Sequence, residues 1–275
     1  MESPLHRSLS SLEARLISSL EFEQQMLVTL DDIERLTGSS RPQATLLASR
    51  LAKKRWLVRV RPGTYQFVPA KMAGLARDDW FVALQAFPGP YYLSFLSAAY
   101  HYGLSPQRPS RAQVAVPRRI DMRGERFTSR IEQIQIGAAR FFGSTQVTRD
   151  GLTIHIAEAE KAVIDAVLRH NRSGGILEVA RIVERAATRL DVVKIANYAL
   201  RMQNVALLQR LGYLLELSGV DPNAGPMAML ASHAHRHRTY LLGSPEASSA
   251  SRTFSQRWGV VDDVGRERLL SEMHH

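Results

Sequence analysis

The sequence predicts an α+β protein, with a small N-terminal domain at residues 1–70 and a larger mixed α/β domain at residues 71–275. Three observations support this prediction. Two short helical patterns flank a turn at residues 38–40, an alternating Val-Arg-Val-Arg segment then turns back at Pro62-Gly63, and strand and helix patterns follow to the C-terminal part. Helix, turn, helix and hairpin in this order are typical of a winged helix-turn-helix.

The N-terminal helices carry their own start and stop signals. Ser10 or Ser11 is a plausible cap for a first helix, and residues 31–37 form a second helix that stops at Gly38. A third helix is expected from about Arg41 to Arg55, because Pro42 suits a first helical turn. We expect this third helix to bury a leucine-rich stripe and to turn its small residues toward solvent. The buried set is Leu46, Leu47, Leu51, Trp56 and Leu57, and the outward set includes Ala44 and Ala48.

The third helix and the hairpin carry the candidate DNA-binding residues. From Arg41 to Arg61 there are seven Arg or Lys and no Asp or Glu. The N-terminal half of the second helix of a helix-turn-helix enters the major groove, where Arg and Gln can contact base edges. Hydroxyls at the helix start and cations at its end and on the hairpin suit phosphates. The candidates are Ser39, Ser40, Arg41, Gln43, Thr45, Ser49, Lys53, Lys54, Arg55, Arg59, Arg61 and Thr64.

The rest of the chain alternates strand and helix patterns. After a link at residues 69–77, the helices are expected at residues 80–87, 92–100, 157–170, 176–188, 190–201 and 205–217. Strands are expected at residues 113–116, 131–136, 141–147, 152–156, 239–242 and 259–261. The helix at 205–217 is the most hydrophobic and should lie centrally, whereas the pattern beyond Gly219 is weaker.

A second basic cluster lies in the larger domain. The first 70 residues hold 10 Lys or Arg against 7 Asp or Glu, so most of the net charge of +10 lies beyond them. Such an excess favours a polyanionic partner. This cluster is either a solvated face, a second nucleic-acid surface or a site for an acidic protein partner. Its residues are Arg118, Arg119, Arg123, Arg126 and Arg130.

Composition and spacing exclude several other functions. The chain has no Cys, which rules out disulfides and thiolate zinc sites. No apolar run approaches the roughly 20 residues of a membrane helix, and no signal peptide is recognisable, so we expect a cytoplasmic protein. His233, His235 and His237 alternate with arginines, which favours an exposed basic segment over a metal site. We expect no catalytic residue, metal or cofactor.

Four segments resemble the AbiEi-type antitoxins of bacterial type IV toxin–antitoxin and abortive-infection systems. They are LAKKRWLVRVRPGTYQFVP, YLSFLSAAYHYGLSPQRP, DGLTIHIAEAEKAVIDAV with Glu160 and Asp165, and the Gly174-Gly175 loop together with ALLQRLGYLLEL. The resemblance implies a transcriptional autorepressor whose winged helix binds inverted repeats in its own promoter. It also implies an antitoxin that counteracts a co-encoded nucleotidyltransferase-like toxin without requiring a stable complex. No catalytic centre is implied.

Other functions remain open from the residues alone. Asp150, Glu158, Glu160 and Lys161 surround a strand and the next helix, a setting in which acids and a lysine bind Mg²⁺ in nucleases. Acids in the first turn of a helix are also favourable without any function. An ordinary metabolic repressor would share the same head, and a protein-interaction or RNA-binding module could use the same basic faces.

Overall fold

The computed structural model describes residues 8–69, 80–85, 87–122, 130–149, 152–234, 238–243 and 252–273, with Arg61, Val82, Gln85 and Arg149 described by their backbone alone. Contacts divide the chain into two compact units. The first consists of Met1–Gly89, Ile120–Glu132 and Gln146–Ile154, and the second of Pro90–Arg119, Gln133–Thr145 and His155–His275. The domain boundary at residue 70 therefore stays a prediction, because the first unit extends beyond it.

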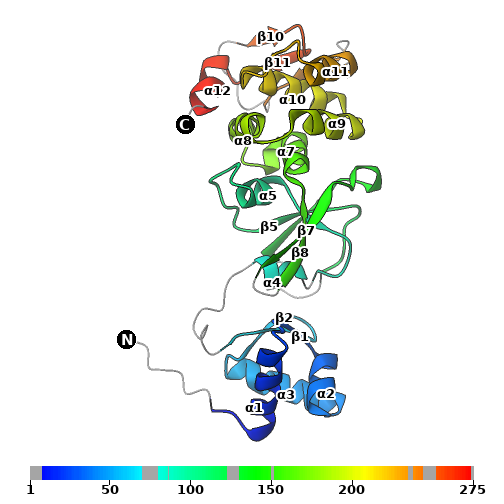
Figure 1. Ribbon diagram of the computed structural model, residues 1–275, viewed down its shortest axis with the longest axis vertical. Helices are drawn as coiled ribbons and strands as arrows, with labels where there is room; N and C mark the ends of the chain where they lie inside the picture. The colour runs from blue at the N-terminus through cyan, green and yellow to red at the C-terminus, as the bar shows by residue number, and fades with distance from the viewer. Residues whose placement is uncertain are drawn as a thin grey trace. The chain divides into compact units, whose positions relative to one another are not determined.

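Residues 8–69, which we call the head, form three helices and a three-stranded sheet. The elements are α1 (Ser11–Phe22), β1 (Leu27–Thr29), α2 (Leu30–Thr37), α3 (Arg41–Lys53), β2 (Leu57–Arg61) and β3 (Thr64–Phe67). The sheet has the order β1-β3-β2 with antiparallel pairs. Figure 1 shows the three helices gathered on one side of this small sheet. The predicted winged helix-turn-helix is confirmed.

Local hydrogen bonds fix the ends of the head helices. The backbone N–H of Ser10 donates to Glu13 Oε2 at 2.7 Å, and that of Thr29 donates to Asp32 Oδ2 at 2.8 Å. The hydroxyls of Ser10 and Thr29 accept in return from the N–H groups of Glu13 and Asp32, which completes two capping boxes. Gly38 ends α2 with a left-handed φ of 69°, a conformation that glycine adopts without strain.

Helix α3 differs from its prediction in the face that it buries. Ala44 and Ala48 are fully buried, whereas Leu46 is 51% exposed. Ala44, Leu47, Ala48 and Leu51 follow the i, i+3, i+4, i+7 spacing of one helical face, and this stripe contributes to the core of the head. Two alanines in the stripe let α3 approach its neighbours closely, so no larger side chain is needed there.

The end of α3 also differs. The helix stops at Lys53, and Arg55, which we expected inside it, has a left-handed φ of 62°. Trp56, Leu57 and Phe67 then join the core of the head. The left-handed residue ends the helix and turns the chain into β2.

A five-stranded mixed sheet lies in the middle of the chain, with the order β6-β5-β4-β8-β7. Strand β4 pairs antiparallel with β5 and parallel with β8. Tyr92 and Leu93, predicted inside a helix, form β4, and the strand expected from residue 141 begins only at Ser144. The elements are α4 (Trp80–Gln85), β4 (Tyr92–Leu93), α5 (Phe95–His101), β5 (Ala112–Val116), β6 (Ile131–Gln135), η2 (Ala138–Arg140), β7 (Ser144–Arg149) and β8 (Leu152–Ala157).

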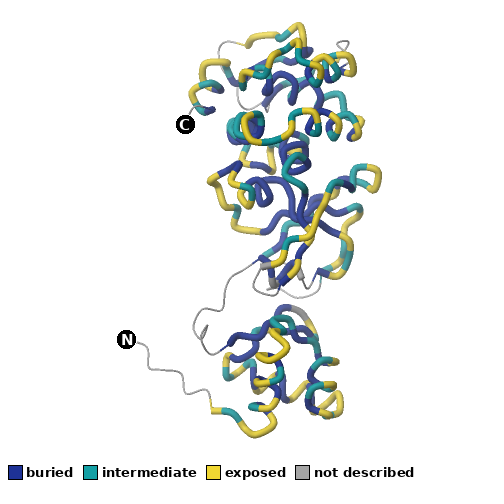
Figure 2. The backbone as a smooth tube through the Cα atoms, in the orientation of Figure 1, coloured by how far each residue is buried: buried dark blue, intermediate teal, exposed yellow. Residues whose placement is uncertain are grey.

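The remaining described elements build a largely helical core. They are α7 (Ala159–Leu168), η3 (His170–Arg172), α8 (Ile176–Arg189), α9 (Val192–Arg201), α10 (Val205–Leu217), α11 (Gly225–His233), β9 (Tyr240–Leu241), β10 (Thr253–Ser255), β11 (Val260–Asp262) and α12 (Arg266–Met273). Helix α10 is buried along most of its length, as predicted, and Figure 2 shows dark blue backbone through this region. Trp258 packs against Gly212 of α10 so closely that a Cβ there would lie 2.1 Å from the indole ring.

The segment beyond Gly219 holds more structure than its pattern predicts. Helices α11 and α12 and strand β10 were not expected, whereas β9 and β11 were. The two helices are short, and each buries only two residues of its own, namely Met227 and Leu230 in α11 and Leu269 and Met273 in α12. Two buried apolar residues per helix give a hydrophobic periodicity that is too weak to be recognised in a single sequence.

Candidate nucleic-acid interface

One side of helix α3 is open to solvent and rich in polar and cationic groups. We call it the reading face, and it consists of Pro42, Thr45, Leu46, Ser49, Arg50 and Lys53. All six side chains are exposed, and they lie opposite the buried stripe of Ala44, Leu47, Ala48 and Leu51. In a helix-turn-helix this is the surface that can enter the major groove.

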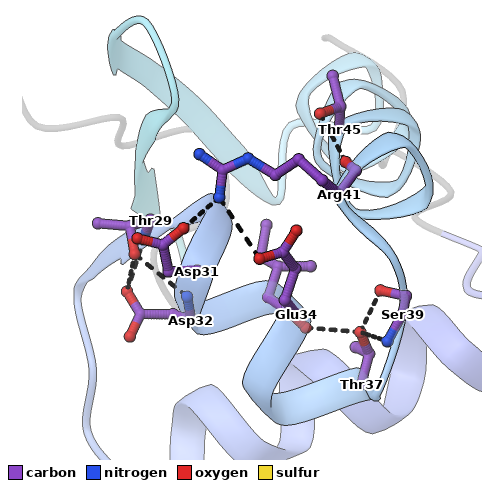
Figure 3. A network of polar contacts seen from close by, with 9 residues as sticks. Thr29, Asp31, Asp32, Glu34, Thr37, Ser39, Arg41 and Thr45 are labelled. Atoms are coloured by element: carbon purple, nitrogen blue, oxygen red, sulfur yellow. Dashed lines mark hydrogen bonds and ion pairs between the residues drawn. The ribbon is translucent and has the colours of Figure 1, made fainter.

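Arg41 lies at the edge of that face and is paired within the head. Its guanidinium contacts the carboxylates of Asp31 and Glu34, both on α2, and the Arg41–Glu34 distance is 3.5 Å (Figure 3). The hydrogen bond to Asp31 raises the pKa of Arg41 above its usual value. The Asp31 and Arg41 side chains are 82% and 54% exposed, so water competes with this pair. To contact a base, Arg41 must first exchange these carboxylates.

The other predicted polar contacts at the start of α3 are also engaged. The N–H of Ser40 donates to Gln43 Oε1 at 3.0 Å, so Gln43 folds back on the helix start. Thr45 Oγ1 donates to the carbonyl of Arg41 at 2.9 Å, and the hydroxyls of Thr37 and Ser39 lie 2.6 Å apart (Figure 3). These bonds stabilise the turn and the first turn of α3, and their exposed partners can still meet phosphate oxygens.

The predicted cations differ in how available they are. Lys53, Arg55 and Arg59 are exposed, whereas Lys54 donates to Glu13 Oε2 on α1 at 2.6 Å. Burial alone would raise the pKa of Glu13, but the hydrogen bonds from Lys54 and Ser10 outweigh it and lower that pKa. Lys54 therefore helps to hold α1 on the head. The side chain of Arg61 lies outside the described residues.

One candidate is corrected, and two residues were overlooked. Thr64 is only 3% exposed because it begins β3, between β1 and β2, so its hydroxyl offers no surface to DNA. Arg50 and Leu46 lie on the reading face but were not among the candidates. Arg50 could have been found from the sequence, because it lies four residues after Leu46 and three before Lys53, which places it on the same face of the helix. The hydrophobicity of Leu46 predicts a place in the core, whereas the structure leaves it 51% exposed.

The second basic cluster is described only in part. Arg118 and Arg119 are exposed beyond β5, and Arg130 is half-buried beside β6. Arg123 and Arg126 lie outside the described residues. Whether these arginines form one surface stays a prediction.

Of the residues proposed for a Mg²⁺ nuclease, Glu158 and Glu160 lie close together, but the cation that they share is Lys194, and Lys161 points elsewhere. Glu158 and Glu160 both pair with Lys194 of α9, at 2.7 and 3.0 Å. The hydrogen bond from Lys194 lowers the pKa of Glu158. Lys161 is fully buried and points instead to Asp165 and to Tyr92 Oη, the latter at 3.0 Å. Asp150 lies outside the described residues. With both acids paired to Lys194 and Lys161 inside the core, the described residues give no support to a Mg²⁺ nuclease site.

The described residues show neither a metal-binding cluster nor a membrane-spanning helix. Among the described residues, no group of three or more His, Asp or Glu side chains could hold a metal ion. His233 Nδ1 lies 3.0 Å from the carbonyl of Met229 in α11, and His235 and His237 lie outside the described residues. No helix in the described part of the chain is long and apolar enough to cross a membrane.

The head is a winged helix-turn-helix, and the family match that covers it is to a transcriptional regulator. Residues 19–68 match the family model "Transcriptional regulator, AbiEi antitoxin", and residues 92–217 match "AbiEi antitoxin C-terminal domain". The two matches together cover more than half of the chain, so the chain belongs to the AbiEi family of antitoxins and regulators. No catalytic family is among these matches.

A solved structure shares the fold. The crystal structure of the RV2827C protein from Mycobacterium tuberculosis superposes with a TM-score of 0.66, covering 98% of this chain and 97% of that one at 17% sequence identity. This identity supports a common fold and nothing finer. A comparison with curated protein sequences gives no significant match.

Proposed function

We propose that the head binds duplex DNA, with α3 in the major groove and the β2–β3 hairpin along the sugar-phosphate backbone. The observation that carries the proposal is the reading face, which exposes Arg50 and Lys53 on the helix that this motif uses for recognition. No acid occurs between Arg41 and Arg61, so nothing on this stretch repels phosphate. The regulator family matched by residues 19–68 supports the same conclusion.

We further propose that the DNA target is an inverted repeat in the protein's own promoter, and that binding represses the operon. One recognition helix contacts only a few base pairs, so a single head provides limited specificity. Two heads on a repeated half-site would combine their affinities. Binding represses transcription if the repeat overlaps the site at which RNA polymerase binds the promoter.

The antitoxin role is proposed for the region that includes residues 92–217. We propose that it counteracts a co-encoded nucleotidyltransferase-like toxin and that this needs no stable complex. The match of this region to the AbiEi antitoxin C-terminal domain is the support. The two functions then belong to two regions of the chain: the head binds DNA, and the region beyond it counteracts the toxin.

DNA binding is tested with the full-length protein, the duplex upstream of its gene and a scrambled duplex of equal length. Arg50→Ala is expected to weaken binding to the upstream duplex about ten-fold, the size of one good base or phosphate contact. Arg15→Ala is the matched control, because Arg15 is an exposed arginine on α1 and lies off the reading face. Equal affinity for both duplexes, or equal losses in both variants, would contradict the proposal.

The antitoxin role is tested by growth of cells that express the adjacent nucleotidyltransferase-like gene. The wild-type chain is expected to restore growth, and Arg50→Ala is expected to restore it equally while releasing the promoter in a reporter strain. Repression without any rescue of growth would indicate an ordinary metabolic repressor instead.

A further inference from the structure

We propose that Leu46 determines sequence specificity by contacting the 5-methyl group of a thymine in the major groove. The inference rests on the proposed DNA binding of the head and adds the class of base that the head selects. It concerns a residue whose hydrophobicity had suggested a place in the core and which the structure leaves in solvent.

Leu46 lies in the middle of the reading face. It follows Pro42 by four residues and precedes Ser49 by three and Arg50 by four, so all four side chains project from one side of α3. It is 51% exposed, although the inward stripe of α3 is complete without it. A single exposed leucine is common on protein surfaces, so its position within a polar recognition surface is what matters.

The polar side chains at the start of α3, on the N-terminal side of Leu46, are already engaged within the head. Arg41 pairs with Asp31 and Glu34 (Figure 3), and Gln43 accepts a hydrogen bond from the backbone of Ser40. In the described structure, the N-terminal half of α3 therefore presents the Leu46 methyl groups where a hydrogen-bonding side chain was expected. Its neighbour Thr45 donates to the carbonyl of Arg41.

The chemistry of Leu46 narrows the choice of base. A leucine side chain neither donates nor accepts a hydrogen bond, so it cannot read the amino, carbonyl or ring-nitrogen groups of the base edges. The apolar group on the major-groove edge of the standard base pairs is the thymine 5-methyl, and apolar side chains recognise it by contact. Burying the two groups against each other also removes the leucine surface from water.

The charge around Leu46 favours DNA over a protein partner. Arg50, Lys53, Arg55 and Arg59 are exposed on α3, at its end and on β2. A second copy of the chain docking through the same face would bring like charges together, which is unfavourable. A polyanion neutralises them while the leucine meets a base.

The test begins with the duplex that the full-length protein selects from a random pool. Each thymine of that duplex is then replaced singly by uracil, which pairs identically and lacks the methyl group. Wild-type affinity is expected to fall about three- to five-fold at one thymine per half-site, the effect of one buried methyl. Leu46→Ala is expected to bind more weakly and to show no further loss at that position.

Leu12→Ala supplies the matched control, because Leu12 is a 40% exposed leucine on α1. This variant should keep the full response to uracil. The inference is overturned if no thymine matters in the selected duplex, or if Leu46→Ala responds to uracil as the wild type does. It is also overturned if Leu46→Ala changes the protein's mass in solution but not its DNA binding, since Leu46 would then serve contact between copies. If the pool yields no enriched duplex, the proposed sequence-specific DNA binding of the head is itself contradicted.

Discussion

The polar contacts at the start of α3 and those around helix α7 differ in exposure and in sequence separation. In the head, Arg41 pairs with Asp31 only ten residues away, and both side chains are largely in water. Around α7, Asp165 accepts hydrogen bonds from Tyr92 at 3.2 Å and from Ser94 at 2.8 Å, more than 70 residues away, and it pairs with the fully buried Lys161. Burial and the charge of Asp165 raise the pKa of Tyr92, and burial lowers that of Lys161.

This difference indicates in which region side chains can be substituted without a large loss of stability. An exposed ion pair contributes little to stability, so the surface of the head can vary with its DNA target. A buried pair is costly to break, because removing one partner leaves the other charge without water or a counterion. The network around Lys161 therefore serves the fold, and the contacts at the start of α3 are free to serve recognition.

The largest effect is expected from Lys161→Met. The substitution leaves Asp165 buried with only hydroxyl partners, at a cost of about 3–5 kcal/mol in the free energy of unfolding. Urea unfolding followed by circular dichroism measures it. Lys194→Met is the control, because Lys194 is 39% exposed and its pairs with Glu158 and Glu160 contribute only about 0–1 kcal/mol. Equal costs in the two variants would remove the contrast between buried and exposed pairs.

An intermediate effect is expected inside the head from Glu13→Gln. Glu13 is 2% exposed, and the change removes its charge-assisted bond to Lys54, at a cost of about 1–3 kcal/mol. The pH dependence has a defined sign. Since the pKa of Glu13 is lowered in the folded head, its contribution is complete above the usual value of 4.5 and is lost as the pH falls below it. Thermal melts from pH 3 to 7 should therefore converge for variant and wild type at the acidic end, and a constant gap would contradict this role.

The smallest effect is expected from Asp31→Asn. Removing this carboxylate releases Arg41 and takes a negative charge away from the start of α3, so DNA affinity should rise about two- to five-fold. Fluorescence anisotropy on the selected duplex measures it, and Glu21→Gln, on α1, provides a control that removes an exposed acid elsewhere in the head. A fall in affinity would instead mean that the pair with Asp31 positions α3 for binding.

Much of the head was predictable because its signals are local. Gly38, the Ser39-Ser40 turn and Pro62-Gly63 each act on neighbouring residues, and the structure places the helices and hairpin where these signals indicate. The buried face of α3 was not predictable, since the choice between Ala44 and Leu46 depends on how closely other elements approach. Hydrophobicity alone favoured the leucine, whereas close packing selected the alanines.

The larger domain was less predictable because its decisive contacts are long-range. Lys161 resembles a surface lysine beside two acids. Its pair with Asp165 lies one helical turn away, but its burial also depends on Tyr92, which is distant in the sequence and which no local pattern connects to it. The same holds for Trp258, whose place against Gly212 of α10 makes the segment beyond Gly219 part of the core. The resemblance to the AbiEi family, carried by motif order, supplied what periodicity could not, and the family matches confirm it.

The salt dependence of DNA binding tests most directly whether the exposed cations of the head bind phosphate. Full-length wild type, Lys53→Ala and Arg15→Ala are titrated with one duplex at several salt concentrations. The slope of log K against log salt should become shallower by about 0.9 in Lys53→Ala and remain that of the wild type in Arg15→Ala. A slope unchanged in Lys53→Ala, or reduced equally in both variants, would contradict DNA binding through this face of the head.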